Sequence, residues 1–295
     1  MTETRDGGAA PEVLRYTAFS SDPDGGNPAG VVLDADGLDE AAMLAVAAEV
    51  GYSETAFVTA PPAGLGAPPG RGFGIRYFSP LAEVPFCGHA TVAAAVALAE
   101  RTGPGELVFA APAGTVPVTV DRASDGTRRA TLTSVEPHVA DVGREDVAEA
   151  LAALGWAHGE LDPELPPRIA YAGARHLVLA AATRGRLAAL EYDVERLKAF
   201  MLRRDLTTLQ LVWRESETVF HVRDPFPVGG VVEDPATGAA AAALGGYLRA
   251  LGLVAAPARL TLHQGHDMGR PGLLEVGLHA DDPRVRVSGA AARIG

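Results

Sequence analysis

Two alanine-rich segments, within residues 90–101 and 239–251, constrain the fold of this 295-residue chain more than any other feature. A helix on a protein surface usually carries one apolar stripe and one polar face. Both segments favour helix and are apolar on every side, so other elements should surround each of them. Their small side chains allow neighbouring strands to approach closely. The sequence therefore predicts two lobes, each a sheet rolled around its own central helix.

The rest of the chain contains many short strand-like segments and few helices. Strands and helices do not alternate regularly, which favours the α+β class over a parallel sheet with crossover helices. Glycine and proline crowd residues 61–74, which are expected to form a loop. Further helices are expected at residues 39–50, 144–154 and 193–200.

We expect the two lobes to interlock. The predicted division is a disordered N-terminus, an N-terminal lobe, a C-terminal lobe and a tail, with room for a C-terminal strand to be exchanged into the first lobe. The corresponding ranges are 1–12, 13–124, 125–288 and 289–295.

A polar motif precedes each alanine-rich helix. Residues 83–91 read Glu-Val-Pro-Phe-Cys-Gly-His-Ala-Thr, and residues 229–238 read Gly-Gly-Val-Val-Glu-Asp-Pro-Ala-Thr-Gly. The first N–H groups of a helix are free, and its N-terminus carries a partial positive charge. Two such ends can together hold an anion such as a carboxylate. We therefore expect a small anionic substrate, despite the acidic composition.

Charge and cysteine content exclude several classes of protein. A formal net charge of -12 argues against binding to nucleic acid or to anionic lipid. The single cysteine, Cys87, excludes an internal disulfide and a multi-cysteine zinc site. His263 and His266 are close in sequence, but no third ligand is evident, so no metal is expected. Without a signal peptide or a long apolar segment, the expected location is the cytoplasm.

An ordered series of motifs resembles the phenazine-biosynthesis PhzF-like family. Ser-Glu-Thr-Ala-Phe-Val at residues 53–58, Cys-Gly-His-Ala-Thr at 87–91 and Val-Val-Glu-Asp-Pro-Ala-Thr-Gly at 231–238 carry most of the resemblance. Further matches before, between and after these motifs extend the resemblance from about residue 14 to residue 288. These occur at residues 16–19, 26–33, 76–80, 173–176, 264–265 and 269–271.

The resemblance implies a diaminopimelate epimerase-like fold, with two pseudo-symmetric lobes and a site in the cleft between them. It also implies a homodimeric isomerase that acts on a small carboxylated metabolite without cofactor or metal. The implied catalytic residues are Glu54, as general acid and base, with His89 and Asp234. We expect His89 and Asp234 to occupy corresponding places in the two halves. The implied substrate-binding residues are Asn27, Gly88, Gly238 and Ala239.

Three positions depart from the phenazine enzyme of the family and leave the substrate open. Ala239 replaces a serine that is common in the family, Ala90 follows the site histidine where proline is found, and Cys87 adds a thiol. One alternative is an amino-acid racemase or epimerase that uses Cys87 with a carboxylate. A two-thiol racemase is excluded, because the second half of the chain has no cysteine. Another alternative is a non-catalytic, small-molecule-binding member.

Overall fold

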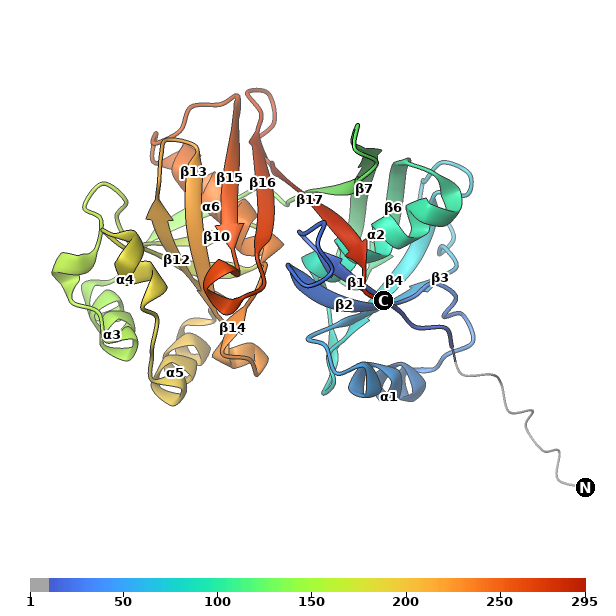
Figure 1. Ribbon diagram of the computed structural model, residues 1–295, viewed down its shortest axis with the longest axis horizontal. Helices are drawn as coiled ribbons and strands as arrows, with labels where there is room; N and C mark the ends of the chain where they lie inside the picture. The colour runs from blue at the N-terminus through green and yellow to red at the C-terminus, as the bar shows by residue number, and fades with distance from the viewer. Residues whose placement is uncertain (1–10) are drawn as a thin grey trace, which may run out of the picture.

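The computed structural model describes residues 11–295 and contains two lobes joined by one long strand (Figure 1). In the first lobe, a closed sheet surrounds helix α2 (Gly88–Thr102). Every residue of this helix from His89 to Ala99 is buried, as the sequence predicted. The strands around this sheet are, in order, β1 (Leu14–Ala18), β2 (Asn27–Val32), β3 (Thr55–Thr59), β4 (Gly72–Phe78), β6 (Gly105–Ala111), β7 (Gly114–Arg122), β8 (Arg128–Thr133) and β17 (Val285–Arg293).

The second lobe repeats this arrangement around helix α6 (Gly238–Ala250), which is buried from Ala240 to Leu248. In order, the strands of its sheet are β9 (His138–Asp141), β10 (Arg168–Tyr171), β11 (Arg175–Ala180), β12 (Thr208–Arg214), β13 (Val219–Pro225), β15 (Ala258–Gln264), β16 (Gly272–Leu278) and β17. From β10 to β17, this sheet has the same sequence of parallel and antiparallel pairings as the first sheet has from β1 to β8, and β9 pairs with β10 as β17 pairs with β1.

A short strand leads into each central helix and is fixed by an arginine. Glu83 begins β5 (Glu83–Val84) and accepts two 2.7 Å hydrogen bonds from Arg76 of β4. Glu233 begins β14 (Glu233–Asp234) and accepts bonds of 2.9 and 2.5 Å from Arg223 of β13. Bidentate pairs of this kind hold a carboxylate in one orientation. The two motifs are therefore positioned in the same way.

The remaining helices lie outside the two sheets. Helix α1 (Glu40–Val50) begins at Asp39, whose side chain accepts a hydrogen bond from Ala42 N, and ends at Gly51, where φ is 71°. This is the usual pairing of an N-terminal carboxylate cap with a C-terminal glycine. The others belong to the second lobe: α3 (Arg144–Leu154), α4 (Arg184–Ala188) and α5 (Val194–Arg204).

Strand β17 crosses between the lobes (Figure 1). Its first half pairs with β16, its central part pairs with β8, and its last three residues pair with β1. Residues 289–293 were expected to be a tail, but they continue this strand. Their Gly-Ala-Ala-Ala sequence gives little strand signal, and only the pairing across lobes makes them a strand.

The boundary between the lobes also lies later than expected. Strand β8 was assigned to the C-terminal lobe, but it pairs with β7 and packs against α2. The turn that joins β7 and β8 contains Gly126, with φ at 89°, and such a turn keeps the two strands in one sheet.

The expectation of a disordered N-terminus concerns residues 1–12, of which residues 1–10 lie outside the described part of the chain. Within residues 11–295, no helix is long and apolar enough to cross a bilayer.

Candidate active site

The three predicted catalytic residues line one cavity of about 470 Å³ between the lobes. Glu54 and His89 come from the first lobe, and Asp234 comes from the second. Gly88, Gly238 and Ala239 line the same cavity, as the sequence predicted. The other lining residues are Val84, Pro85, Phe86, Cys87, Ala113, Tyr171, Gly173, Ala174, Arg175, Asp205, Thr207, Phe226, Ala236 and Thr237.

The N-termini of both central helices meet in this cavity. A Cβ atom added to Gly88 would lie 3.9 Å from the Cα atom of Gly238, so the two helix ends are in near contact. Neither helix has a side chain that caps its first turn by a hydrogen bond. Free N–H groups and the helix dipoles therefore concentrate positive potential where an anionic group can bind.

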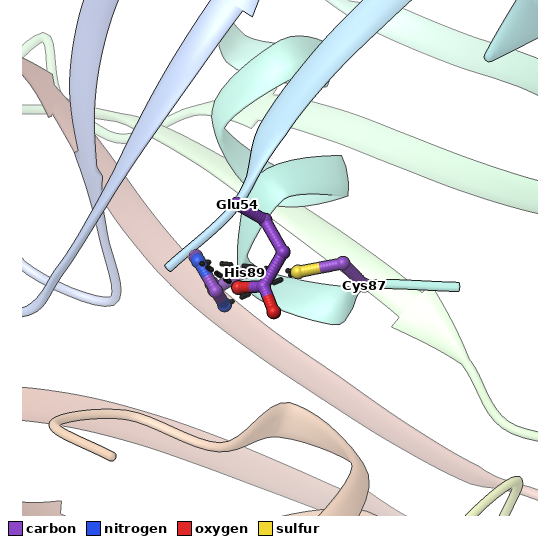
Figure 2. Close-up of side chains that lie close together, drawn as sticks. All are labelled: Glu54, Cys87 and His89. Carbon is purple, nitrogen blue, oxygen red and sulfur yellow. Dashed lines mark hydrogen bonds and ion pairs between the residues drawn. The ribbon is translucent and has the colours of Figure 1, made fainter. Parts of the chain in front are cut away.

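Glu54, His89 and Cys87 form one contact cluster on the first lobe (Figure 2). The Nε2 atom of His89 lies 3.4 Å from a carboxylate oxygen of Glu54, and the Nδ1 atom lies 3.3 Å from the sulfur of Cys87. The Glu54 side chain is 15% exposed and that of His89 is 7% exposed. Burial raises the pKa of Cys87 well above its usual range, and the nearby charge of Glu54 adds to the effect. The resting thiol is therefore uncharged.

Asp234 is buried on the opposite lobe with partners for both of its oxygens. Asn27 donates a 2.7 Å hydrogen bond to one oxygen, and the hydroxyl of Thr237 donates a 2.5 Å bond to the other. Burial raises the pKa of Asp234 to about 6, while the charge of His89 and both hydrogen bonds oppose this rise. Asp234 can therefore change its protonation state close to neutral pH.

Asn27 does not line the cavity, although the sequence suggested that it binds substrate. Its amide donates to Asp234 and, at 3.1 Å, to the backbone oxygen of Ala236. Gln264 fixes the same turn from the other side, because it accepts a bond from Thr237 N and donates one to Asp234 O, each 2.9 Å long. Asn27 thus holds Asp234 in place, and its direct contact with a substrate stays a prediction.

The repeated topology shows that His89 and Asp234 do not occupy corresponding places, contrary to expectation. Asp234 ends β14 as Val84 ends β5, whereas His89 follows Gly88 as Ala239 follows Gly238. The two helix starts align by their glycines, and the sequence motifs align in the same way. The lobes therefore contribute different chemical groups to the cavity.

The same alignment places Thr237 opposite Cys87, and Thr207 opposite Glu54. Thr237 and Cys87 are the N-cap residues of α6 and α2, while Thr207 and Glu54 directly precede β12 and β3. Each candidate base of the first lobe, Glu54 or Cys87, thus has a threonine hydroxyl at the matching position of the second lobe. Hydroxyls do not accept protons readily at neutral pH, so among these groups the candidates for proton exchange are Glu54, Cys87 and Asp234.

Sequence reasoning missed a buried polar group behind Asp234. The backbone of Asp224 in β13 pairs with that of Asp234. Thr208 donates a 3.2 Å hydrogen bond to Asp224, and the Nδ1 atom of His176 lies 2.8 Å from the Thr208 hydroxyl. Burial raises the pKa of Asp224 well above its usual range, with a further contribution from the charge of Asp234, and burial lowers the pKa of His176 to about 3. The available signal was an acidic residue within a strand-forming segment, Val-Phe-His-Val-Arg-Asp-Pro at residues 219–225.

Comparisons with known proteins agree with this arrangement. A sequence profile of the family described as "phenazine biosynthesis-like protein" (PhzC-PhzF) matches residues 16–294. The chain belongs to this family. An uncharacterised isomerase of Escherichia coli O157:H7, YddE, is 33% identical over 292 residues, which cover 95% of each chain. A trans-2,3-dihydro-3-hydroxyanthranilate isomerase of Pseudomonas chlororaphis is 32% identical over 286 residues, covering 94% of this chain and 95% of that protein.

Solved structures support the family and the fold. A PhzF-family protein of Bacillus anthracis superimposes with a TM-score of 0.83 at 25% identity, covering 96% of both chains. A hydroxyproline epimerase of Agrobacterium vitis superimposes with a TM-score of 0.64 at 13% identity, covering 96% of this chain and 90% of that one, and so supports the fold alone. The α+β, diaminopimelate epimerase-like fold is thus confirmed. This PhzF-like protein is an enzyme of the isomerase class, as predicted, so the non-catalytic alternative is set aside.

Proposed function

We propose that this PhzF-like protein isomerises a small carboxylated metabolite by moving one proton, with Glu54 as the general acid and base and without a cofactor. The observation that carries the proposal is the position of Glu54. Its carboxylate faces the cavity between the lobes, lies 3.4 Å from His89, and influences the pKa of Asp234 on the other side. A partly buried carboxyl group can both accept and return a proton.

The cavity lining supports an anionic substrate with an apolar body. The helix ends at Gly88 and Gly238 offer N–H groups to a carboxylate, and Arg175 adds a cationic side chain to the wall. Phe86 and Phe226 line the same space and suit a small ring or hydrocarbon portion. Local positive potential at the helix ends outweighs the distant net charge.

The proposed reaction conserves all atoms of the substrate. Glu54 removes a proton from one carbon, the electron pair of that C–H bond shifts through an adjacent double bond, and Glu54 returns the proton to another carbon. His89 orients the Glu54 carboxylate and supports its charge. Asp234, in its ionised form, accepts a hydrogen bond from an amine or hydroxyl group of the substrate. Because the Glu54 side chain is still 15% exposed, the carboxyl group can exchange its proton with water before it returns one to the substrate.

The test uses trans-2,3-dihydro-3-hydroxyanthranilate, on which named relatives act, as the first substrate offered. In heavy water we expect deuterium at one carbon of the product, detected by NMR and mass spectrometry. Glu54→Gln should lower turnover by at least about 10²-fold, since general acid–base catalysis contributes about 10²–10⁴. Glu49→Gln, the same change at an exposed position on α1, is the matched control and should leave turnover unchanged. Unchanged turnover in Glu54→Gln would refute the proposed role.

A second candidate function is amino-acid racemisation with Cys87 as one base and a carboxylate as the other. The contact of 3.3 Å between the thiol and His89 favours it, because an imidazole can accept the thiol proton. Burial of Cys87 and the hydroxyl of Thr237 at the matching place in the second lobe argue against it. Proline and hydroxyproline enantiomers offered in heavy water would distinguish the two. Exchange at Cα that disappears in Cys87→Ala would favour racemisation.

A further inference from the structure

Three chemically different ligand atoms converge at the wall of the cavity. A carboxylate oxygen of Glu54, the sulfur of Cys87 and a ring nitrogen of His89 all lie within 4.8 Å of one another. Figure 2 shows the three side chains pointing toward a common point from the segment before β3 and from the start of α2. Among residues 11–295, no other group of three or more histidine, cysteine and acidic side chains meets this distance.

The spacing is close to that of ligands around one zinc ion. Tetrahedral bonds of about 2.3 Å to sulfur and 2.0–2.1 Å to nitrogen or oxygen place neighbouring ligand atoms about 3.3–3.6 Å apart. The Nε2 atom of His89 lies 3.4 Å from the Glu54 oxygen and 3.9 Å from the Cys87 sulfur. The Nε2 atom of His89 and the sulfur of Cys87 therefore need to approach each other by only about 0.3 Å to reach the spacing of zinc ligands.

The charges of the three groups also suit a divalent ion. A zinc ion with a carboxylate, a thiolate and a neutral imidazole forms a complex with no net charge. Such a complex avoids much of the cost of placing an isolated charge in a buried position. Cys87 loses its proton when the metal binds, as cysteine ligands must. The mixture of sulfur, nitrogen and oxygen favours zinc over magnesium or calcium, which prefer oxygen alone.

We propose that Glu54, Cys87 and His89 bind one zinc ion reversibly, and that the bound ion blocks the isomerase. All three ligands line the cavity, so the fourth coordination position faces the space that a substrate would fill. Zinc bound to the Glu54 carboxylate would prevent that group from accepting the substrate proton. The blocking effect rests on the proposed function of Glu54, whereas metal binding does not. The ion is an inhibitor here and takes no part in the reaction.

The test measures metal binding directly on the full chain after treatment with a chelator. Zinc is titrated in competition with a chromophoric chelator, and cobalt(II) serves as a spectroscopic probe. We expect one zinc ion per chain. The cobalt complex should show thiolate-to-metal absorption in the near ultraviolet and the intense visible bands of a tetrahedral site. Thermal unfolding curves of all variants establish that they are folded.

Two variants and one control locate the site. Cys87→Ser removes the sulfur with little change in size; it should abolish the thiolate band and lower zinc affinity at least about 100-fold, since changes outside the ligand shell alone cost about 10–100-fold. Glu54→Gln should weaken zinc binding as well. The control is His263→Ala, because the rings of His221, His263 and His266 lie 4.9–6.4 Å apart and form the rival histidine cluster. This variant should bind zinc as the unmodified chain does.

Two outcomes overturn the metal site: no stoichiometric zinc binding at micromolar concentrations, or binding that survives Cys87→Ser but is lost in His263→Ala. Turnover and zinc binding, measured together, distinguish failure of the metal site from failure of the proposed function. If Glu54→Gln abolishes turnover but the chain binds no zinc, only the metal site is refuted. If zinc binds with the expected thiolate band but turnover continues at full occupancy, the blocking effect and the role of Glu54 are both refuted.

Discussion

Replacement of Asn27 by alanine should make the stability of the protein more dependent on pH. Asn27 donates a 2.7 Å hydrogen bond to buried Asp234, whose pKa is about 6 against a usual value of 3.8. A raised carboxyl pKa destabilises the folded state at high pH, and this penalty disappears as the pH falls from about 6 to about 4. A difference of about two pKa units corresponds to about 3 kcal/mol in the free energy of unfolding.

Asn27→Ala should increase the loss of stability that the raised pKa of Asp234 causes at high pH. A hydrogen bond to a charged group contributes about 1.5–3 kcal/mol, so its loss should raise the pKa of Asp234 by a further one to two units. Asn27→Ala also leaves a small cavity and an unsatisfied carbonyl at Ala236, but those costs do not depend on pH. The pH-dependent part is therefore attributable to Asp234. We expect Asn27→Ala to lose about 2 kcal/mol more stability at pH 8.5 than at pH 5.

Urea unfolding followed by circular dichroism at the two pH values measures this difference. Thr131→Ala is the control, because it removes a partly buried 2.7 Å hydrogen bond between two hydroxyl groups, Thr131 and Ser288. Its effect on stability should be the same at both pH values. An equal loss at both pH values in Asn27→Ala, or a larger loss at pH 5, would contradict the assigned contact with an ionising Asp234.

Three further variants test other parts of the structure. Gly289→Ala places a Cβ atom 2.3 Å from the ring of buried Phe19, so we expect a loss of about 1–3 kcal/mol in thermal unfolding; an unchanged melting temperature would contradict close packing of β17 against Phe19. Asp224→Asn should keep or raise the free energy of unfolding at pH 8, because burial raises the pKa of Asp224 well above its usual range and disfavours its charged form; a loss above about 3 kcal/mol would mean that the carboxylate is ionised and paired. Arg175→Gln should raise KM more than it lowers kcat if the substrate is anionic, whereas an unchanged KM would exclude a contact with the substrate.

Local patterns in the sequence predicted the central elements of this fold and much of its site. The run of mostly small apolar residues from Ala90 to Ala99 predicted a helix buried on all sides, because it has no polar face to turn toward water. The resemblance to the PhzF-like family implied that Glu54, His89 and Asp234 share one site, and all three line one cavity. The helix is predicted by one short segment, whereas the site residues were predicted by an ordered series of motifs along the chain.

Features that depend on contacts between distant segments were not predictable in this way. The role of Asn27 depends on a partner 207 residues away in the sequence. The correspondence between Asp234 and Val84 is different: it could have been read from the two aligned motifs, and the pairings of β14 and β5 agree with it. Strand β9 at residues 138–141 has an alternating but weak pattern, and its pairing with β10 defines it. For such segments, contacts with distant parts of the chain determine the structure more than the local sequence does.

The path of β17 also limits the order in which the protein can fold. Residues 285–293 close the first lobe between β8 and β1, although every other strand of that lobe lies before residue 134. During synthesis, the first lobe therefore keeps two open strand edges until the ribosome has released nearly all of the second lobe. Such edges can pair with other chains, so the nascent protein is exposed to misassembly for most of its translation. The cavity that holds Glu54 and Asp234 can be completed only after that late strand has been added.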